Sequence, residues 1–191
     1  SNGPVYADYA PALLGIPEED VLNYAVGGAR AVGEQDFGAV LAASPLARPD
    51  PDPAFTSYDI NLGAQVDRFL EDAQDLGDLS GSAASITIGL NDLRQLPGLI
   101  DLANPDPKAV QPATTALLSD ILASTMQAAS DLAAAGVGTI ILGTLPAVTR
   151  AEPTPEQAFL GGVVSQYNDA LIESAAAIEA LGADAIVVDF E

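Results

Sequence analysis

Apolar and polar positions alternate with two different periods in the second half of the chain. Three short β-branched runs, residues 84–89, 139–144 and 185–190, are typical of strands covered on both faces. An apolar stripe at helical spacing, residues 117–132, predicts a helix between the first two runs. Thr154-Pro-Glu-Gln157 is a capping box with proline in the first turn, and it predicts a second helix that runs towards Gly182.

The first half has a weaker pattern. Residues 21–26 (VLNYAV) form a short strand candidate that leads directly into Gly27-Gly28, and residues 65–73 have helical spacing. No period holds in residues 34–60, where four prolines interrupt the chain. An excursion of this length inside a compact domain is typical of a functional loop, so we interpret residues 34–60 as a long loop or lid.

The order of the elements predicts the fold class. Strand, helix, strand, helix, strand is the pattern of a parallel sheet with crossover helices. A chain of 191 residues with 49% hydrophobic content is about one domain and can bury most of its apolar surface. We therefore expect a single α/β domain, built as a three-layer α/β/α sandwich.

Charge and composition exclude several classes of function. The formal net charge of −21 repels phosphate backbones, so we expect no nucleic-acid partner, and no apolar run has the length of a transmembrane segment. The chain has no cysteine and no histidine. A complete Ser-His-Asp triad cannot be assembled from these residues, and a cysteine-ligated metal is excluded. The acidic residues between 50 and 78 lack the spacing of a calcium loop, so we expect neither metal nor cofactor.

Chemistry in a parallel sheet is concentrated at the carboxyl ends of its strands. After the first strand candidate, Gly28 can present its backbone N–H at close range, because neither it nor Gly27 carries a Cβ. After the next, Asn91 can present a side-chain amide. Two neutral donors directed at one point are what an oxyanion hole requires. Taken separately, Gly-Gly is also typical of a tight turn, and Asn91-Asp92 of a turn or helix cap.

The order of these motifs resembles a known family. Residues 23–29 (NYAVGGA) and 88–92 (IGLND) are similar to the second and third conserved blocks of the SGNH, or GDSL, serine esterases and lipases. Residues 1–6, residues 65–67, Leu145-Pro146 and Asn168 also fit that pattern. The resemblance covers essentially the whole chain and is closest to the bacterial phospholipase, lecithinase or haemolysin-like branch.

The resemblance implies roles for individual residues. Gly28 matches the oxyanion glycine of the family, and Asn91 matches its oxyanion asparagine. The family's nucleophilic serine belongs to a Gly-Asp-Ser block, and its histidine to an Asp-x-x-His pair; neither block occurs in this sequence. Asp189 follows a strand, and we interpret it as an ordinary strand-end carboxylate and not as the triad acid.

The family's sheet is flavodoxin-like and mostly parallel, and its first strand and C-terminal helix have no counterpart here. We therefore expect residues 1–191 to be one hydrolase domain that is incomplete at both ends. An open position in the sheet exposes strand edges, so we expect poor independent stability.

The implied function is ester hydrolysis through an acyl-enzyme. This segment is expected to supply the oxyanion hole and to be inactive alone. The expected partner is a small-molecule or lipid ester, and apolar residues in the 34–60 loop favour lipid or aryl esters over sugars. Two alternatives remain, a carbohydrate O-deacetylase and a non-catalytic α/β binding or adhesion module that keeps only the scaffold. By resemblance, the location is secreted or at the cell envelope.

Overall fold

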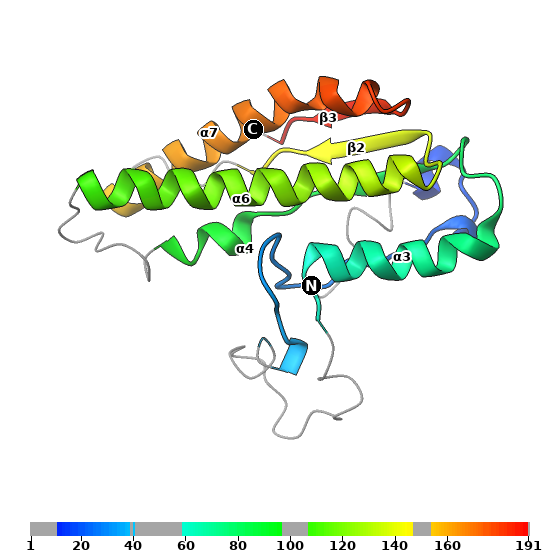
Figure 1. The fold of residues 1–191 in the computed structure, drawn as a ribbon, viewed down its shortest axis with the longest axis horizontal. Helices are drawn as coiled ribbons and strands as arrows, with labels where there is room; N and C mark the ends of the chain where they lie inside the picture. Colours follow the sequence, from blue (N-terminus) through cyan, green and yellow to red (C-terminus); the bar gives the residue numbers. More distant parts are fainter. Residues whose placement is uncertain (1–10, 39, 41–58, 97–106, 147–153, 191) are drawn as a thin grey trace.

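The computed structural model describes residues 11–38, 40, 59–96, 107–146 and 154–190. In this part of the chain, helices alternate with the strands of one sheet (Figure 1). The elements, in chain order, are η1 (Glu18–Asp20), α3 (Leu62–Leu76), β1 (Ala83–Ile86), α4 (Leu90–Leu93), α6 (Pro107–Ala134), β2 (Thr139–Gly143), α7 (Pro155–Glu179) and β3 (Asp184–Val188).

The sheet is parallel, with the strand order β1-β2-β3. Its register places Ile86 of β1, Leu142 of β2 and Val187 of β3 side by side. Because β2 is central, its inward side chains Ile140 and Leu142 are completely buried. The prediction of an α/β fold with a parallel sheet is confirmed.

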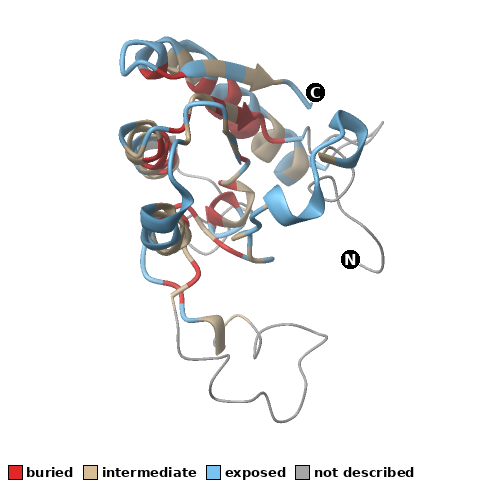
Figure 2. Cartoon of the chain, turned by 90° about the vertical axis from the view of Figure 1, so that its right-hand side faces the viewer, coloured by how far each residue is buried: buried red, intermediate tan, exposed pale blue. Residues whose placement is uncertain are grey.

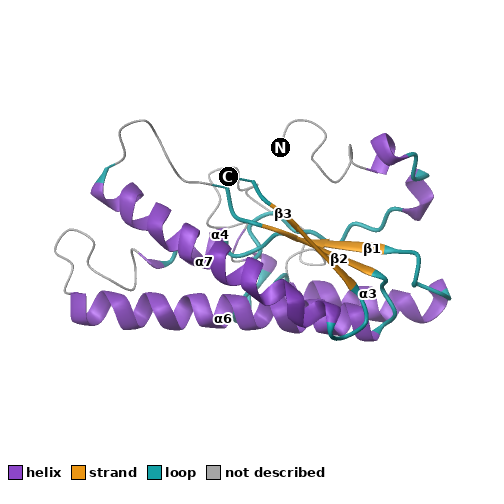
Figure 3. Cartoon of the chain, turned by 90° about the horizontal axis from the view of Figure 1, so that it is seen from above, coloured by secondary structure: helices purple, strands orange, loops and turns teal. Residues whose placement is uncertain are grey.

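The long helices form one layer against the sheet. Figure 3 shows α6 and α7 on the same side of the sheet, and Figure 2 shows that the buried residues lie in the interior of the fold. Contacts between the elements place α7 and α3 each beside α6. The core joins strand residues to residues of α6 and α7 such as Ile121 and Tyr167. On the opposite face of β3, Ile186 is 48% exposed. Within the described residues, this helix layer and the sheet belong to the predicted sandwich. That residues 1–191 form a single domain stays a prediction.

Local sequence signals place the helix starts. The Thr154 hydroxyl accepts a hydrogen bond from the Gln157 N–H at 3.2 Å, and the Gln157 side chain accepts one from the Thr154 N–H at 3.0 Å. This confirms the predicted capping box at the start of α7. The helix predicted over residues 65–73 begins earlier, at Leu62, because Asn61 caps it by accepting from the Ala64 N–H at 2.8 Å.

The strand predicted at residues 21–26 is wrong. This segment is irregular in the structure, and its side chains attach it to α3. The Tyr24 hydroxyl donates to the Asp72 carboxylate at 2.7 Å, and the Tyr24 ring packs edge-on against Phe69 at 5.9 Å. A strand needs a neighbouring backbone with which to pair, and no sheet ladder to this segment occurs among the described residues.

Each predicted strand also ends earlier than its apolar run. The strands stop at Ile86, Gly143 and Val188, so the last residues of each run form the connections at the carboxyl edge. At this edge, Gly89 has a φ of +118° and starts α4. A Cβ at Gly89 would lie 3.0 Å from Ile121, so glycine allows the turn to pass close to α6.

Candidate active site

Gly28 occupies the turn that follows residues 21–26. The Ala29 N–H donates to the Val26 carbonyl at 3.1 Å, and Gly28 has a φ of +91° at the third position of this turn. A type II turn requires a positive φ there, which favours glycine. A Cβ at Gly28 would lie 2.9 Å from the Val40 side chain, so the position is also sterically restricted. Both features explain the glycine without reference to catalysis.

Asn91 lies in the first turn of α4 and contacts the Gly28 loop. Its amide nitrogen Nδ2 donates to the Ala29 carbonyl at 2.8 Å, and its Oδ1 accepts from Arg94 Nη1 at 3.2 Å. These two bonds fix which way the amide points. The two residues singled out from the sequence are therefore joined through Ala29, the residue directly after Gly28. Their catalytic role stays a prediction.

Asp92 holds the next part of the same loop. It is fully buried, and its two carboxylate oxygens accept from the backbone N–H groups of Ala31 at 2.8 Å and Val32 at 3.1 Å. Burial raises the pKa of Asp92 above its ordinary value, and the backbone donors and the Arg30 guanidinium oppose this rise only in part. The sequence predicts only a turn or cap role for Asp92. Its contact with the loop could not be predicted, because the loop lies about sixty residues away in the chain.

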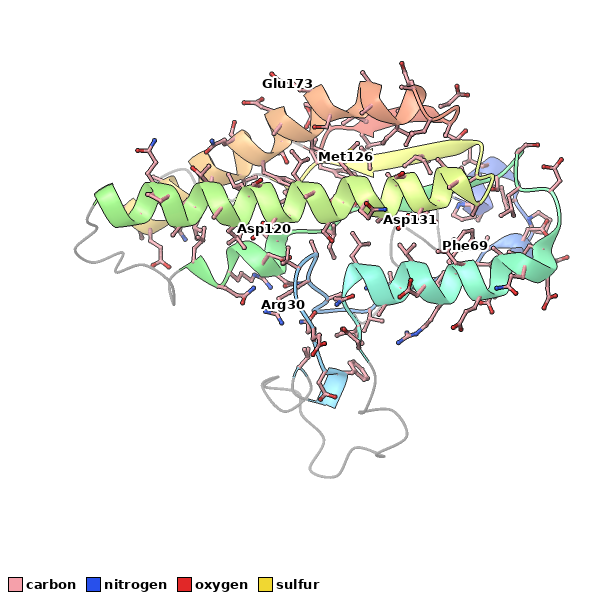
Figure 4. All side chains as sticks on the ribbon, in the orientation of Figure 1. Arg30, Phe69, Asp120, Met126, Asp131 and Glu173 are labelled. Atoms are coloured by element: carbon pink, nitrogen blue, oxygen red, sulfur yellow. The ribbon has the colours of Figure 1, made fainter. Side chains whose placement is uncertain are left out.

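Gln35 and Arg30 complete the support of the loop. The Gln35 side chain donates to the Gly28 carbonyl at 2.8 Å and accepts from the Arg30 N–H at 2.7 Å. The Arg30 guanidinium donates to the Gln95 side chain at 2.8 Å and to the Glu34 carbonyl at 3.0 Å, beside the end of α4 (Figure 4). No pattern in the sequence indicates Gln35 as a loop-positioning residue. Residues 28–35 are thus fixed by side chains at several points.

The predicted 34–60 loop is described only at its base. Asp36 and Asp59 form an isolated antiparallel bridge, and the Ile60 N–H donates to the Gln35 carbonyl at 3.0 Å. Residues 39 and 41–58 lie outside the described residues, so the lid role stays a prediction.

The segment that follows β2 is held by Asn168 of α7. Its side chain accepts from the Leu145 N–H at 2.8 Å and donates to the Leu145 carbonyl at 2.9 Å. Asn168 is 3% exposed, so this paired contact is isolated from solvent. Beside it, the Thr144 hydroxyl donates to the Asp189 carboxylate at 3.1 Å and accepts from the Phe190 N–H at 2.8 Å. Asp189 thus closes the end of β3 onto β2, in keeping with a strand-end carboxylate.

Two further observations concern only the part of the chain that the structure describes. Within it, no group of three or more acidic side chains is arranged to hold a metal ion. No helix there has the length and apolar character needed to cross a membrane.

Comparison with known proteins agrees with the motif order. A search of curated proteins finds no match. The model of the family described as GDSL-like Lipase/Acylhydrolase matches residues 1–191, which is the whole sequence. The match therefore includes both Gly28 and Asn91. The chain belongs to the GDSL-like lipase/acylhydrolase family.

Proposed function

We propose that this chain serves the hydrolysis of carboxylic esters through an acyl-enzyme, and that Gly28 and Asn91 stabilise the oxyanion. Membership of the GDSL-like lipase/acylhydrolase family supports action on esters in general. The nucleophilic serine and the histidine base are proposed to come from outside these 191 residues, because the sequence contains no Gly-Asp-Ser block and no histidine. The segment alone is therefore proposed to be inactive on esters.

One contact carries the assignment of the two donors. Asn91 Nδ2 lies 2.8 Å from the carbonyl of Ala29, and this contact holds the amide against the turn that contains Gly28. An amide NH₂ group has two hydrogens, so Asn91 keeps a second donor after this bond. The Arg94 contact to Asn91 Oδ1 and the Asp92 contacts to the loop support a fixed arrangement. Donors that are fixed before the reaction need no reorganisation as charge develops.

The reaction follows the usual sequence for a serine esterase. The serine oxygen attacks the ester carbonyl while histidine takes the serine proton, and the carbonyl oxygen becomes an oxyanion. The Gly28 N–H and the Asn91 amide donate to that oxygen. The tetrahedral intermediate expels the alcohol, which receives the proton from histidine, and water then hydrolyses the acyl-serine to release the carboxylic acid.

The first test is the coding sequence on either side of this segment. A Gly-Asp-Ser block upstream and an Asp-x-x-His block downstream would supply the serine and the histidine, and we expect to find both. A start codon and a stop codon that directly flank the segment would overturn the proposal. The absence of histidine would then favour the second candidate, a non-catalytic α/β binding or adhesion module.

The second test is kinetic and uses the polypeptide that includes those two blocks. Asn91→Ala is expected to lower kcat on p-nitrophenyl butyrate by about 10²–10³, the usual cost of one oxyanion donor, with a much smaller rise in KM. Gln127→Ala also removes an amide, one that bonds to Asp131 on α6, and serves as the matched control. An Asn91→Ala variant with the kcat of the control would remove Asn91 from the mechanism.

A further inference from the structure

Arg94 is the charged side chain that contacts Asn91. It follows Leu93, the last residue of α4, and its backbone stays helical, with a φ of −64° and a ψ of −12°. Side chains three positions apart lie on the same face of a helix, so Arg94 can reach back to Asn91. Arg94 Nη1 donates to Asn91 Oδ1 at 3.2 Å. The local fold of α4 therefore places a positive charge within hydrogen-bond distance of the candidate oxyanion donor.

The contact with Arg94 decides which end of the Asn91 amide faces the Gly28 loop. A guanidinium group can only donate, so it binds the amide oxygen, and the Ala29 carbonyl can only accept, so it binds the amide nitrogen at 2.8 Å. A reversed amide would place donor against donor and acceptor against acceptor. The two contacts thus favour the same orientation, in which one hydrogen of Nδ2 binds Ala29 and the second remains a donor.

The positive charge of Arg94 also changes the strength of that donor. A cation that binds the oxygen of an amide draws electron density from its N–H bonds, and hydrogen bonds that share a group in this way strengthen one another. Asp92 is the carboxylate next to Asn91 in the chain, but its two oxygens accept from the backbone N–H groups of Ala31 and Val32. Among the contacts described for α4, the Arg94 charge therefore meets the Asn91 amide and not the Asp92 carboxylate.

From this geometry we infer that Arg94 is a positioning residue for ester hydrolysis, which orients the Asn91 amide and strengthens its N–H towards the oxyanion. The inference rests on the proposed function, because Arg94 acts through Asn91. Arg94 is exposed, so water weakens the effect of its charge, and the Ala29 carbonyl still holds the amide when Arg94 is replaced. The expected loss is therefore about tenfold in kcat, below the loss of about 10²–10³ expected for removal of the amide itself.

Two substitutions at Arg94 separate its charge from its hydrogen bond. They are made in the polypeptide that includes the proposed serine and histidine blocks, and hydrolysis of p-nitrophenyl butyrate is measured. Arg94→Gln keeps a side-chain NH₂ donor but has no charge, and it should lower kcat about tenfold with little change in KM. Arg94→Lys keeps the charge and should retain kcat within about threefold. An unchanged kcat in Arg94→Gln, or an equal loss in both variants, would overturn the proposal.

A double-mutant cycle tests whether Arg94 acts through Asn91. In the Asn91→Ala background the amide is gone, so Arg94→Gln should change kcat by less than about twofold. A loss of about tenfold in this background would overturn the proposal, because Arg94 would then act without the amide.

The matched control removes the same charge from another helix. Arg68 lies on α3, where its Nη2 donates to the Asp59 carbonyl at 2.8 Å, and Arg68→Gln is expected to leave kcat unchanged. A loss in Arg68→Gln as large as the loss in Arg94→Gln would attribute the effect to net charge and would also overturn the proposal.

The outcomes distinguish this inference from the proposed function. If Asn91→Ala lowers kcat by about 10²–10³ and Arg94→Gln does not lower it, the oxyanion assignment holds and the role of Arg94 fails. If Asn91→Ala leaves kcat unchanged, the oxyanion assignment fails, and the role of Arg94 fails with it whatever the result for Arg94→Gln.

Discussion

Replacement of Asp92 by asparagine tests whether this buried carboxylate holds the loop next to Gly28. Each of its two oxygens accepts one backbone N–H, from Ala31 and from Val32. Asparagine keeps the shape of the side chain but has only one acceptor oxygen, and its NH₂ group is a donor. One of these two N–H groups then faces another donor.

The structure gives the size of the effect. Loss of one hydrogen bond to a charged group costs about 1.5–3 kcal/mol. Asparagine also removes a buried charge, and the raised pKa of Asp92 shows that burial of this charge is unfavourable. This relief offsets part of the loss, so Asp92→Asn should lower the free energy of unfolding by about 1–2 kcal/mol near neutral pH. Asp92→Ala leaves both N–H groups unpaired and should cost about twice as much.

The pH dependence has a defined sign. The folded-state pKa of Asp92 lies above the ordinary value of 3.8, so the folded chain holds this proton more tightly than the unfolded chain. The corresponding stability is fully present below the ordinary pKa and is lost as the pH rises through the folded pKa. The introduced asparagine cannot titrate, so the destabilisation by Asp92→Asn should be largest in acid and should decrease towards neutral pH.

Urea-induced unfolding of the polypeptide that includes the proposed serine and histidine blocks, followed by far-ultraviolet circular dichroism, measures both effects. Asp120→Asn, which removes a carboxylate from an exposed position of α6, is the matched control and should change the free energy of unfolding by less than about 0.5 kcal/mol. If Asp92→Asn has the same unfolding midpoint as Asp120→Asn, then Asp92 does not hold the loop and the reasoning is refuted.

Two further predictions concern the neighbouring residues. Gly28→Ala should lower the free energy of unfolding by about 1–2 kcal/mol, because the positive φ and the close Val40 side chain disfavour a Cβ at this position. Gly27→Ala is the control, since no atom lies near its added Cβ, and urea unfolding should show a smaller loss for it. Burial and the Asp72 carboxylate raise the pKa of Tyr24 to about 12, so its contribution to stability should be complete below 10.0 and lost as the pH rises through about 12. Tyrosinate absorbance, followed as the pH is raised, should show one group that ionises near pH 12 in the unmodified chain and should not show it in Tyr24→Phe. The same curve for both proteins would contradict the assignment of this pKa to Tyr24.

The sequence by itself determined the features that depend on near neighbours. The capping box from Thr154 to Gln157, the apolar run of β2 and the class of the fold all follow from residues a few positions apart. The motif order around Gly28 and Asn91 was also sufficient to indicate the family to which the chain belongs.

Only the tertiary structure decided the features that need a distant partner. Residues 21–26 have strand-like composition, but a strand also requires a paired backbone, and here Tyr24 binds α3 instead. The sequence predicts only a turn or cap role for Asp92. In the folded chain, Asp92 accepts a hydrogen bond from the Ala31 N–H, and burial raises its pKa. A small cavity arises in the same way, because Leu93 of α4 and Leu160 of α7 line it only when the two helices are brought together. Burial and long-range hydrogen bonds are properties of the folded chain, so they cannot be predicted from local periodicity.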